Sequence, residues 1–85
     1  MTEEYTGKVA AAVIPDLEGF KYLIAKREDN GDWEFPGGKQ HTDESLMETA
    51  EREIQEELGL KIESKKTAEN HSYQGGGYEI IPVLA

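Results

Sequence analysis

Residues 38–60 read GKQHTDESLMETAEREIQEELGL and contain seven of the chain's 18 acidic residues. The pattern predicts a helix that begins after Ser45, because Ser45 and Glu48 form a Ser-x-x-Glu capping box. Gly59 is the residue type that commonly follows the end of a helix. Apolar residues recur at every fourth position between these signals: Leu46, Ala50, Ile54 and Leu58. We therefore expect one stripe of this helix to be buried.

Three glutamates would crowd together near the C-terminal end of this helix. Glu53 and Glu57 are one turn apart, and Glu56 lies beside them at i+3. Like charges at this spacing repel by roughly a few tenths of a kcal/mol, and the last turn of a helix favours cations. A hard divalent cation would relieve the repulsion, because Mg²⁺ binds carboxylate and carbonyl oxygens and leaves room for phosphate oxygens. The alternative explanation of such a run is a solvated acidic surface.

The same segment resembles the Nudix box. That motif consists of Gly, five residues, Glu, seven residues, Arg-Glu, an apolar residue, any residue, Glu-Glu, any residue, Gly and an apolar residue. Every fixed position is filled in this chain: Gly38, Glu44, Arg52, Glu53, Ile54, Glu56, Glu57, Gly59 and Leu60.

The resemblance implies a hydrolase of the MutT type that uses Mg²⁺, with Mn²⁺ as an alternative. It implies that Glu56, Glu57 and the Gly37 carbonyl bind the metal. Glu53 would bind the metal or orient the attacking water. Arg52 would fix the rotamer of a glutamate, as residues behind metal ligands do, and Glu44 would support the loop or a more distant metal.

Residues 33–39, WEFPGGK, form the second informative stretch, which we interpret as a turn. A proline followed by two glycines lets the backbone approach a ligand closely. By resemblance to MutT-type proteins, this stretch would line the nucleotide site and Arg27 would contact the nucleotide. The stretch supplies the expected substrate-binding residues Glu34, Phe35, Pro36, Gly37, Gly38 and Lys39. From the residue type alone, Phe35 is expected to pack in the core.

Four other segments complete the expected fold. Residues 8–14 and 20–27 read as two strands of a hairpin, residues 61–74 as an irregular strand, and residues 78–85 as a strand whose Pro82 indicates an edge or a bulge. Residues 75–77 read as a flexible loop, and His41 and His71 as surface residues. The fold class is α/β (α+β), with a mixed sheet packed against the box helix in one partial Nudix domain, residues 1–85. Family members are usually longer, so the resemblance implies that C-terminal strands and a second helix are missing, and the open side would favour a homodimer.

Composition limits the partners of the chain. The 85 residues carry a net charge of −9, which argues against binding a nucleic-acid polymer or an anionic membrane. A nucleoside triphosphate is compatible with this charge, because it arrives as a metal complex. The chain has no cysteine, and its N-terminal apolar run is short, so we expect a cytoplasmic protein without a signal peptide or a membrane span.

Three functions are consistent with these features. The first is Mg²⁺-dependent hydrolysis of a nucleoside diphosphate linked to another group, favouring a nucleoside triphosphate, including an oxidised one, that yields monophosphate and pyrophosphate. The second is a catalytically incompetent fragment that only binds metal and nucleotide. The third is an acidic interaction protein without phosphate chemistry.

Overall fold

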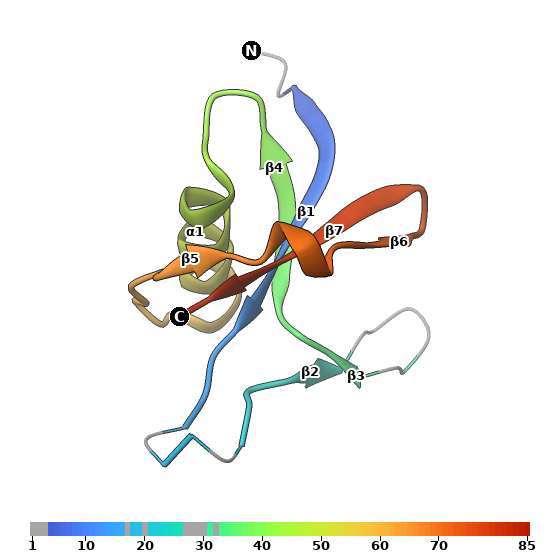
Figure 1. Ribbon diagram of the computed structural model, residues 1–85. Coiled ribbons are helices and arrows are strands. Elements are labelled where there is room, and N and C mark those ends of the chain that lie inside the picture. Colours follow the sequence, from blue (N-terminus) through green and yellow to red (C-terminus); the bar gives the residue numbers. More distant parts are fainter. Residues whose placement is uncertain (1–3, 17, 20, 27–30, 32) are drawn as a thin grey trace.

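The computed structural model describes residues 4–16, 18–19, 21–26, 31 and 33–85. These residues form several strands, one α-helix and one short 3-10 helix (Figure 1). The elements, in chain order, are β1 (Tyr5–Val13), β2 (Ala25–Lys26), β3 (Trp33–Glu34), β4 (Gly37–His41), α1 (Leu46–Leu58), β5 (Lys66–Thr67), η1 (Glu69–His71), β6 (Tyr73–Gly75) and β7 (Tyr78–Leu84). None of the described helices is long and apolar enough to cross a lipid bilayer.

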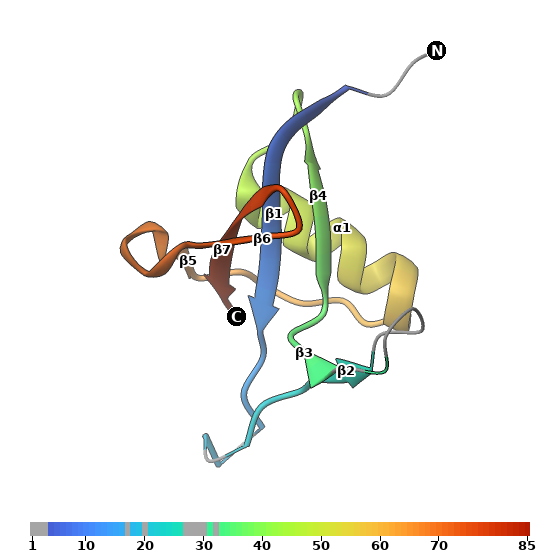
Figure 2. The same cartoon turned by 90° about the vertical axis from the view of Figure 1, so that its right-hand side faces the viewer.

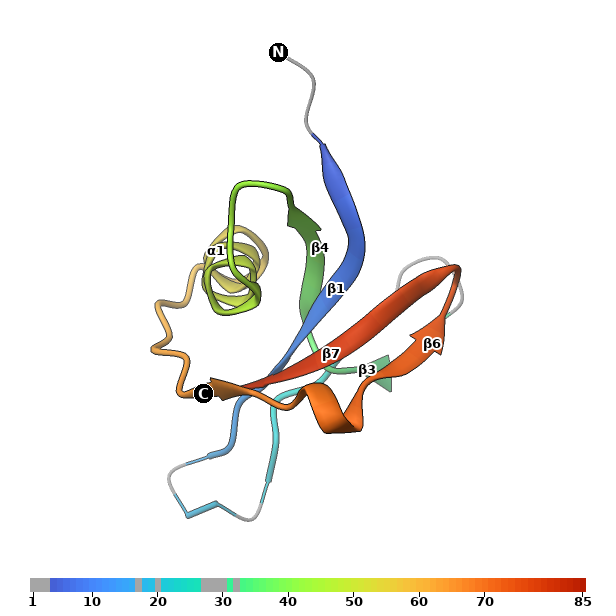
Figure 3. The ribbon, with the colours of Figure 1, turned by 45° about the horizontal axis from the view of Figure 1, so that its top comes forward.

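The main sheet is mixed, as predicted. Its strands run in the order β4-β1-β7-β5, and β6 also pairs with β7. Strand β1 is parallel to β7 and antiparallel to β4, so the N-terminal strand lies in the middle of the sheet. Helix α1 covers one face of this sheet beside β4 and β1. The small β2–β3 sheet lies beyond the N-terminal end of β4 (Figures 2 and 3).

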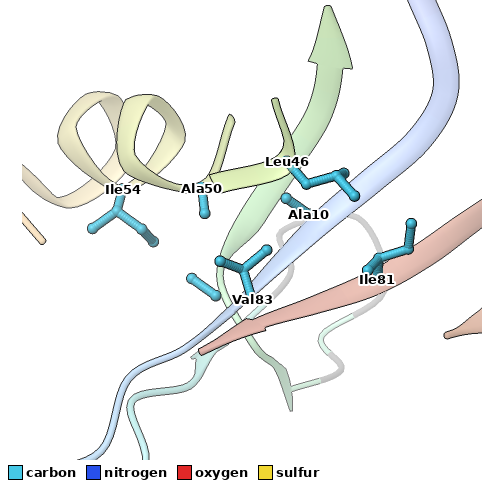
Figure 4. Packing of buried hydrophobic residues seen from close by; sticks show 7 residues of the cluster. Ala10, Leu46, Ala50, Ile54, Ile81 and Val83 are labelled. Atoms are coloured by element: carbon cyan, nitrogen blue, oxygen red, sulfur yellow. The ribbon is translucent and has the colours of Figure 1, made fainter. Parts of the chain in front are cut away.

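The core lies between α1 and the two central strands (Figure 4). Small residues on β1 let the helix approach the sheet, while larger side chains from α1 and β7 fill the space. The buried cluster consists of Ala10, Ala12, Leu46, Ala50, Ile54, Ile81 and Val83. Burying a side chain such as Ile54 contributes about 1.5–3 kcal/mol, so these few residues fix α1 against the sheet.

Helix α1 begins and ends where the sequence predicts. The Ser45 side chain accepts from the Glu48 amide, the Glu48 carboxylate accepts from the Ser45 amide, and Gly59 adopts φ 67°. The expected burial of Leu58 is wrong, because this residue is 40% exposed. Steps of four residues overshoot a full turn by about 40° each, so Leu58 has rotated about 120° from Leu46 and left the buried face.

Two expectations for residues 20–39 are corrected. Residues 33–39 are not a turn, since β3 and most of β4 lie there. Of the predicted strand 20–27, only Ala25–Lys26 forms a strand, and it pairs with β3 instead of β1. A bridge between Pro15 and Tyr22 is the remnant of the expected hairpin with β1. Residues 20 and 27 lie outside the described residues.

The C-terminal half also differs in detail. Residues 61–74 contain two short strands, β5 and β6, separated by η1. The expected flexible loop at residues 75–77 is a tight hairpin turn, because Gly76 and Gly77 have φ 57° and 85° and Gly75 pairs with Tyr78. Positive φ at both central residues suits the twist of a two-residue hairpin.

Pro82 lies in an inner strand, so the expectation of an edge position is wrong. β7 is flanked by β1 on one side and by β5 and β6 on the other. The Pro82 carbonyl accepts from the Ala68 amide at 2.7 Å, so the proline nitrogen faces the same side. On that side the neighbouring segment of the same chain leaves the sheet as η1. The N–H that proline lacks therefore removes no hydrogen bond to β1.

Candidate functional site

Arg52 is the centre of the polar network on α1. Its guanidinium contacts three carboxylates and one backbone carbonyl. Nε and Nη2 donate to Glu44 at 3.0 and 2.7 Å, Nη1 donates to Glu53 at 2.8 Å and to Glu56 at 3.4 Å, and Nη2 also donates to the Lys39 carbonyl at 3.1 Å. The planar fork of arginine holds these acceptors in a fixed geometry. Arg52 therefore contacts the glutamates whose orientation it is predicted to fix, and that role stays a prediction.

Glu44 is the best-anchored carboxylate of the described residues. Besides Arg52, it accepts from the His41 amide at 3.0 Å and from the Thr49 hydroxyl at 2.9 Å. Hydrogen bonds from Arg52 lower the pKa of Glu44 to about 2, against the opposing effect of burial. The same contacts with Glu44 raise the pKa of Arg52. Glu44 is thus an ionised anchor that closes the β4–α1 loop onto the helix.

Glu53, Glu56 and Glu57 differ strongly in their surroundings. The Glu53 side chain is 18% exposed, whereas that of Glu56 is 59% exposed. Partial burial of its carboxyl group, followed by the charge of Glu53 and a hydrogen bond with it, raises the pKa of Glu57 to about 7. Glu57 is nevertheless exposed as a whole residue. The charges of Glu34 and Glu56 act in the same direction, so crowding of carboxylates contributes to the raised pKa of Glu57.

Gly37 and Gly38 are required by close packing. A Cβ on Gly37 would overlap the carbonyl oxygen of Ala10 in β1. A Cβ on Gly38 would overlap the carboxyl group of Glu53. Neither glycine has a positive φ. The two glycines thus bring β4 against β1 and leave space for a glutamate of the Nudix-like segment, a role not expected from the sequence, which predicted close approach to a ligand.

The Gly37 carbonyl lies on the open edge of β4. The Pro36 carbonyl accepts from the Ala12 amide at 2.7 Å, so Pro36 faces β1. Because ladder bonds alternate along an antiparallel pair, the carbonyls of Gly37 and Lys39 face away from β1. The bond from Arg52 to the Lys39 carbonyl agrees with this direction. A carbonyl oxygen free of the ladder is therefore available two residues from the Arg52 network.

Most of the predicted substrate-binding residues line one cleft. Its volume is about 580 Å³, and it opens on the sheet face that carries Val9 and Ile80, opposite α1. The predicted residues on its wall are Glu34, Phe35, Gly37, Gly38 and Lys39. Pro36 is buried and does not line the cleft. Arg27 lies outside the described residues.

Aromatic side chains give the cleft its apolar surface. Trp33 is 63% exposed. Phe35 is 37% exposed and meets Tyr22 edge-to-face at a centroid distance of 6.2 Å, so its expected core position is wrong. The Lys39 ammonium lies 5.0 Å from the ring centroid of Tyr78, and its hydrogen bond to Tyr78 raises the pKa of Lys39.

The described residues contain no group of three or more acidic or histidine side chains placed to hold a metal ion. The donor chemistry nevertheless suits a hard cation. Burial and the charge of Glu53 raise the pKa of Glu57, Glu56 is adjacent and exposed, and the Gly37 carbonyl faces outward. Carboxylate and carbonyl oxygens are the ligands that Mg²⁺ prefers.

Sequence reasoning did not identify Thr49 as a partner of Glu44. Thr49 is fully buried on α1, and its hydroxyl contacts Glu44. The available signal was its position five residues after Glu44 and three after Leu46, on the face expected to be buried. A polar residue on a buried face needs a partner, which would have directed attention to Glu44.

Residues 6–79 match the family model of the NUDIX domain. The chain belongs to the Nudix family. The complete box at residues 38–60 and the sheet that packs on its helix are the features that this chain shares with the family. The predicted family is therefore confirmed.

The relatives extend beyond the matched segments. The CTP pyrophosphohydrolase of Escherichia coli strain K12 is 36% identical over 74 residues, which cover 82% of this chain and 53% of that protein. The putative 8-oxo-dGTP diphosphatase YtkD of Bacillus subtilis strain 168 is 46% identical over 48 residues, which cover 56% of this chain and 30% of that protein. The chain thus spans about half or less of these relatives.

Solved Nudix structures share the fold. A MutT structure from a study of Aliivibrio salmonicida and Vibrio cholerae superimposes with a TM-score of 0.74 and 28% identity, covering 92% of this chain and 63% of the other. The Escherichia coli ORF135 protein gives a TM-score of 0.68 and 33% identity, covering 91% of this chain and 56% of the other. The predicted mixed sheet with the box helix is therefore the Nudix arrangement.

Proposed function

We propose that this Nudix chain binds a nucleoside triphosphate together with Mg²⁺ and hydrolyses it to a monophosphate and pyrophosphate. One water is consumed, one phosphorus–oxygen bond of the anhydride breaks, and the proton of the water passes to a carboxylate. The named relatives act on CTP or carry the name of 8-oxo-dGTP diphosphatases, so cytidine and oxidised guanine nucleotides are the first substrates to test.

The observation that carries the proposal is the Glu53–Glu57 pair beside Arg52. Two carboxyl groups lie one helical turn apart, next to an arginine that binds Glu53 at 2.8 Å, and burial together with the charge of Glu53 raises the pKa of Glu57 to about 7. Such a pair is unfavourable without a cation, because like charges in a partly buried site repel. A divalent ion at Glu53, Glu56, Glu57 and the Gly37 carbonyl would relieve this repulsion. Mn²⁺ would fit the same oxygen ligands.

Each residue then has a role that its contacts support. Bound Mg²⁺ would neutralise charge on the phosphoryl oxygens. Glu53, held by Arg52 on one oxygen, is placed to bind the metal or to orient the water with its other oxygen. The cleft with Trp33 and Phe35 offers aromatic surface to a base. Lys39 on the same wall offers a positive charge to the phosphates.

Turnover by the 85-residue chain tests the proposal. The chain is assayed with Mg²⁺ and a panel containing CTP, dGTP and 8-oxo-dGTP, and the phosphorus products are followed by ³¹P NMR. Monophosphate and pyrophosphate are expected, with a loss of more than 100-fold in Glu53→Gln and Glu57→Gln. Glu63→Gln changes an exposed glutamate outside the network and serves as the control. Turnover that survives both variants would contradict the proposed site.

Binding without turnover is the second candidate. It is favoured by the absence of a preformed three-carboxylate metal site among the described residues. It predicts that Mg²⁺-dependent nucleotide binding is retained, and is lost in Glu57→Gln, while no product forms. Isothermal titration of the same nucleotides alongside the ³¹P assay separates the two candidates.

A further inference from the structure

Thr49 is a buried polar residue on α1, and its hydroxyl lies near two acceptors that precede the helix. It is 0% exposed. Its Oγ1 lies 2.9 Å from the Ser45 carbonyl and 2.9 Å from Oε1 of Glu44. A hydroxyl has one proton to donate. The Ser45 carbonyl already accepts the helical bond from the Thr49 amide at 2.9 Å, and the ionised Glu44 is the stronger acceptor.

Both oxygens of the Glu44 carboxylate accept hydrogen bonds. Oε1 accepts from the His41 amide, the Thr49 hydroxyl and Arg52 Nη2, while Oε2 accepts from Arg52 Nε. A carboxylate has about four lone-pair sites, so Oε1 is fully occupied and Oε2 retains one site. Glu44 therefore acts as an anchor for Arg52, and its contacts favour the expected role in supporting the loop.

The orientation of Arg52 follows from this anchor. Two nitrogens of its planar group are held by Glu44, so the third, Nη1, can point in only one direction. That direction leads to Glu53 Oε1 at 2.8 Å. A rotation of the Glu44 carboxylate would turn the guanidinium and move the donor that holds Glu53.

We propose that Thr49 is a positioning residue: its hydroxyl fixes the carboxylate of Glu44, which orients Arg52 and thereby Glu53. The consequence for turnover rests on the proposed function, whereas the positioning itself does not. The Thr49 hydroxyl bonds to Glu44 and to the Ser45 carbonyl, so it would act on Glu53 through two intermediate side chains.

Three substitutions at one position separate the hydroxyl from the packing. Thr49→Val keeps the shape and removes the hydroxyl, Thr49→Ala removes both the hydroxyl and the methyl group, and Thr49→Ser keeps the hydroxyl. The readout is the ¹⁵N–¹H signal of Arg52 Nε, whose proton is held by Glu44 in the wild-type chain. Thr67→Val, on β5 and outside the network, is the matched control.

The expected result is an Arg52 Nε–H signal that exchanges slowly in the wild type, Thr49→Ser and Thr67→Val. In Thr49→Val and Thr49→Ala the signal should shift or be lost to exchange. Titration with Mg²⁺ should show an affinity about tenfold weaker in these two variants, the lower range for residues that support metal ligands. If Thr49→Val does not fold, the comparison of Thr49→Ala with Thr49→Ser decides.

An unchanged Arg52 signal in the folded variants that lack the hydroxyl would overturn the proposal. Equal loss in Thr49→Ser and Thr49→Val would also overturn it, because packing and not the hydroxyl would then be responsible. The outcome is independent of catalysis. A chain that shows the Arg52 response but hydrolyses no nucleotide would retain the positioning role of Thr49 and refute the proposed function alone.

Discussion

Lowering the pH from about 5 to 2 is expected to protonate Glu44 and thereby remove about 2–3 kcal/mol of folding free energy. This is most of the stability that its lowered pKa contributes. The pKa of Glu44 falls from 4.5 in the unfolded chain to about 2 in the folded one. Each unit of pKa difference corresponds to about 1.4 kcal/mol, so the upper bound is about 3.5 kcal/mol. The Glu44 side chain is 12% exposed and that of Arg52 25% exposed, so solvent screens the pair only in part.

The sign follows from the direction of the shift. A carboxyl group with a lowered pKa stabilises the folded state fully above its unfolded pKa, here above about pH 5. The contribution is lost as the pH falls through 4.5 toward 2, because the folded chain must then bind a proton that breaks the contact with Arg52. A domain of this size has a total stability of about 4–13 kcal/mol, so one group would account for a large share of its acid sensitivity.

Urea unfolding at a series of pH values between 7 and 2.5 measures this contribution. Glu44→Gln should be less stable than the wild type at pH 7 by about 2–3 kcal/mol or more, because Arg52 also loses its charged partner. The two free energies of unfolding should converge as the pH approaches 2.5. Glu63→Gln, which changes an exposed glutamate, should follow the wild type throughout. A Glu44→Gln deficit that stays constant from pH 7 to pH 2.5 would refute the reasoning, since packing and not charge would then explain it.

Three further outcomes follow from the same contacts. Gly38→Ala should displace the flexible carboxyl end of Glu53 and weaken Mg²⁺ binding with little loss of stability, whereas Gly37→Ala presses on backbone and should cost about 1–3 kcal/mol in urea unfolding. Without metal, the ¹³C signal of the Glu57 carboxyl should titrate near pH 7. Because that pKa is raised, stability should fall as the pH rises from 4.5 through 7, and Glu57→Gln should abolish this slope. Ile54→Ala should cost about 2–5 kcal/mol, measured by thermal or urea unfolding.

Features that depend on neighbouring residues in the chain were predicted well. The capping box at Ser45 and the left-handed Gly59 set the ends of α1, and both act within one helical turn. The identity of the box itself also lies in one continuous segment. Such local rules need no knowledge of the rest of the sheet, which is why the helix and the family could be predicted.

Features that depend on the partner strand were predicted poorly. Pro82 was expected at an edge or a bulge because proline lacks a donor, but only the path of η1 shows that no donor is needed there. The strand at residues 20–27 was paired with β1, although β2 pairs with β3 and β1 pairs with β7. Pairing between strands distant in sequence is not encoded in the period of a single segment.

The positions of Glu53 and Glu57 on α1 explain how the Nudix box contacts the sheet. At about 100° per residue, Glu53 and Glu57 lie within about 20° on either side of Leu46 around the helix axis. They therefore lie on the side of the helix that faces the sheet, where Glu53 is only 18% exposed, while Glu57 in the last turn remains exposed. Glu53 meets β4 at Gly38, where any larger residue would occupy its place. Gly38, which begins the Nudix box, and Glu53, fifteen positions later, thus pack against each other. Arg52 holds the charged carboxylate of Glu53 at the edge of the sheet.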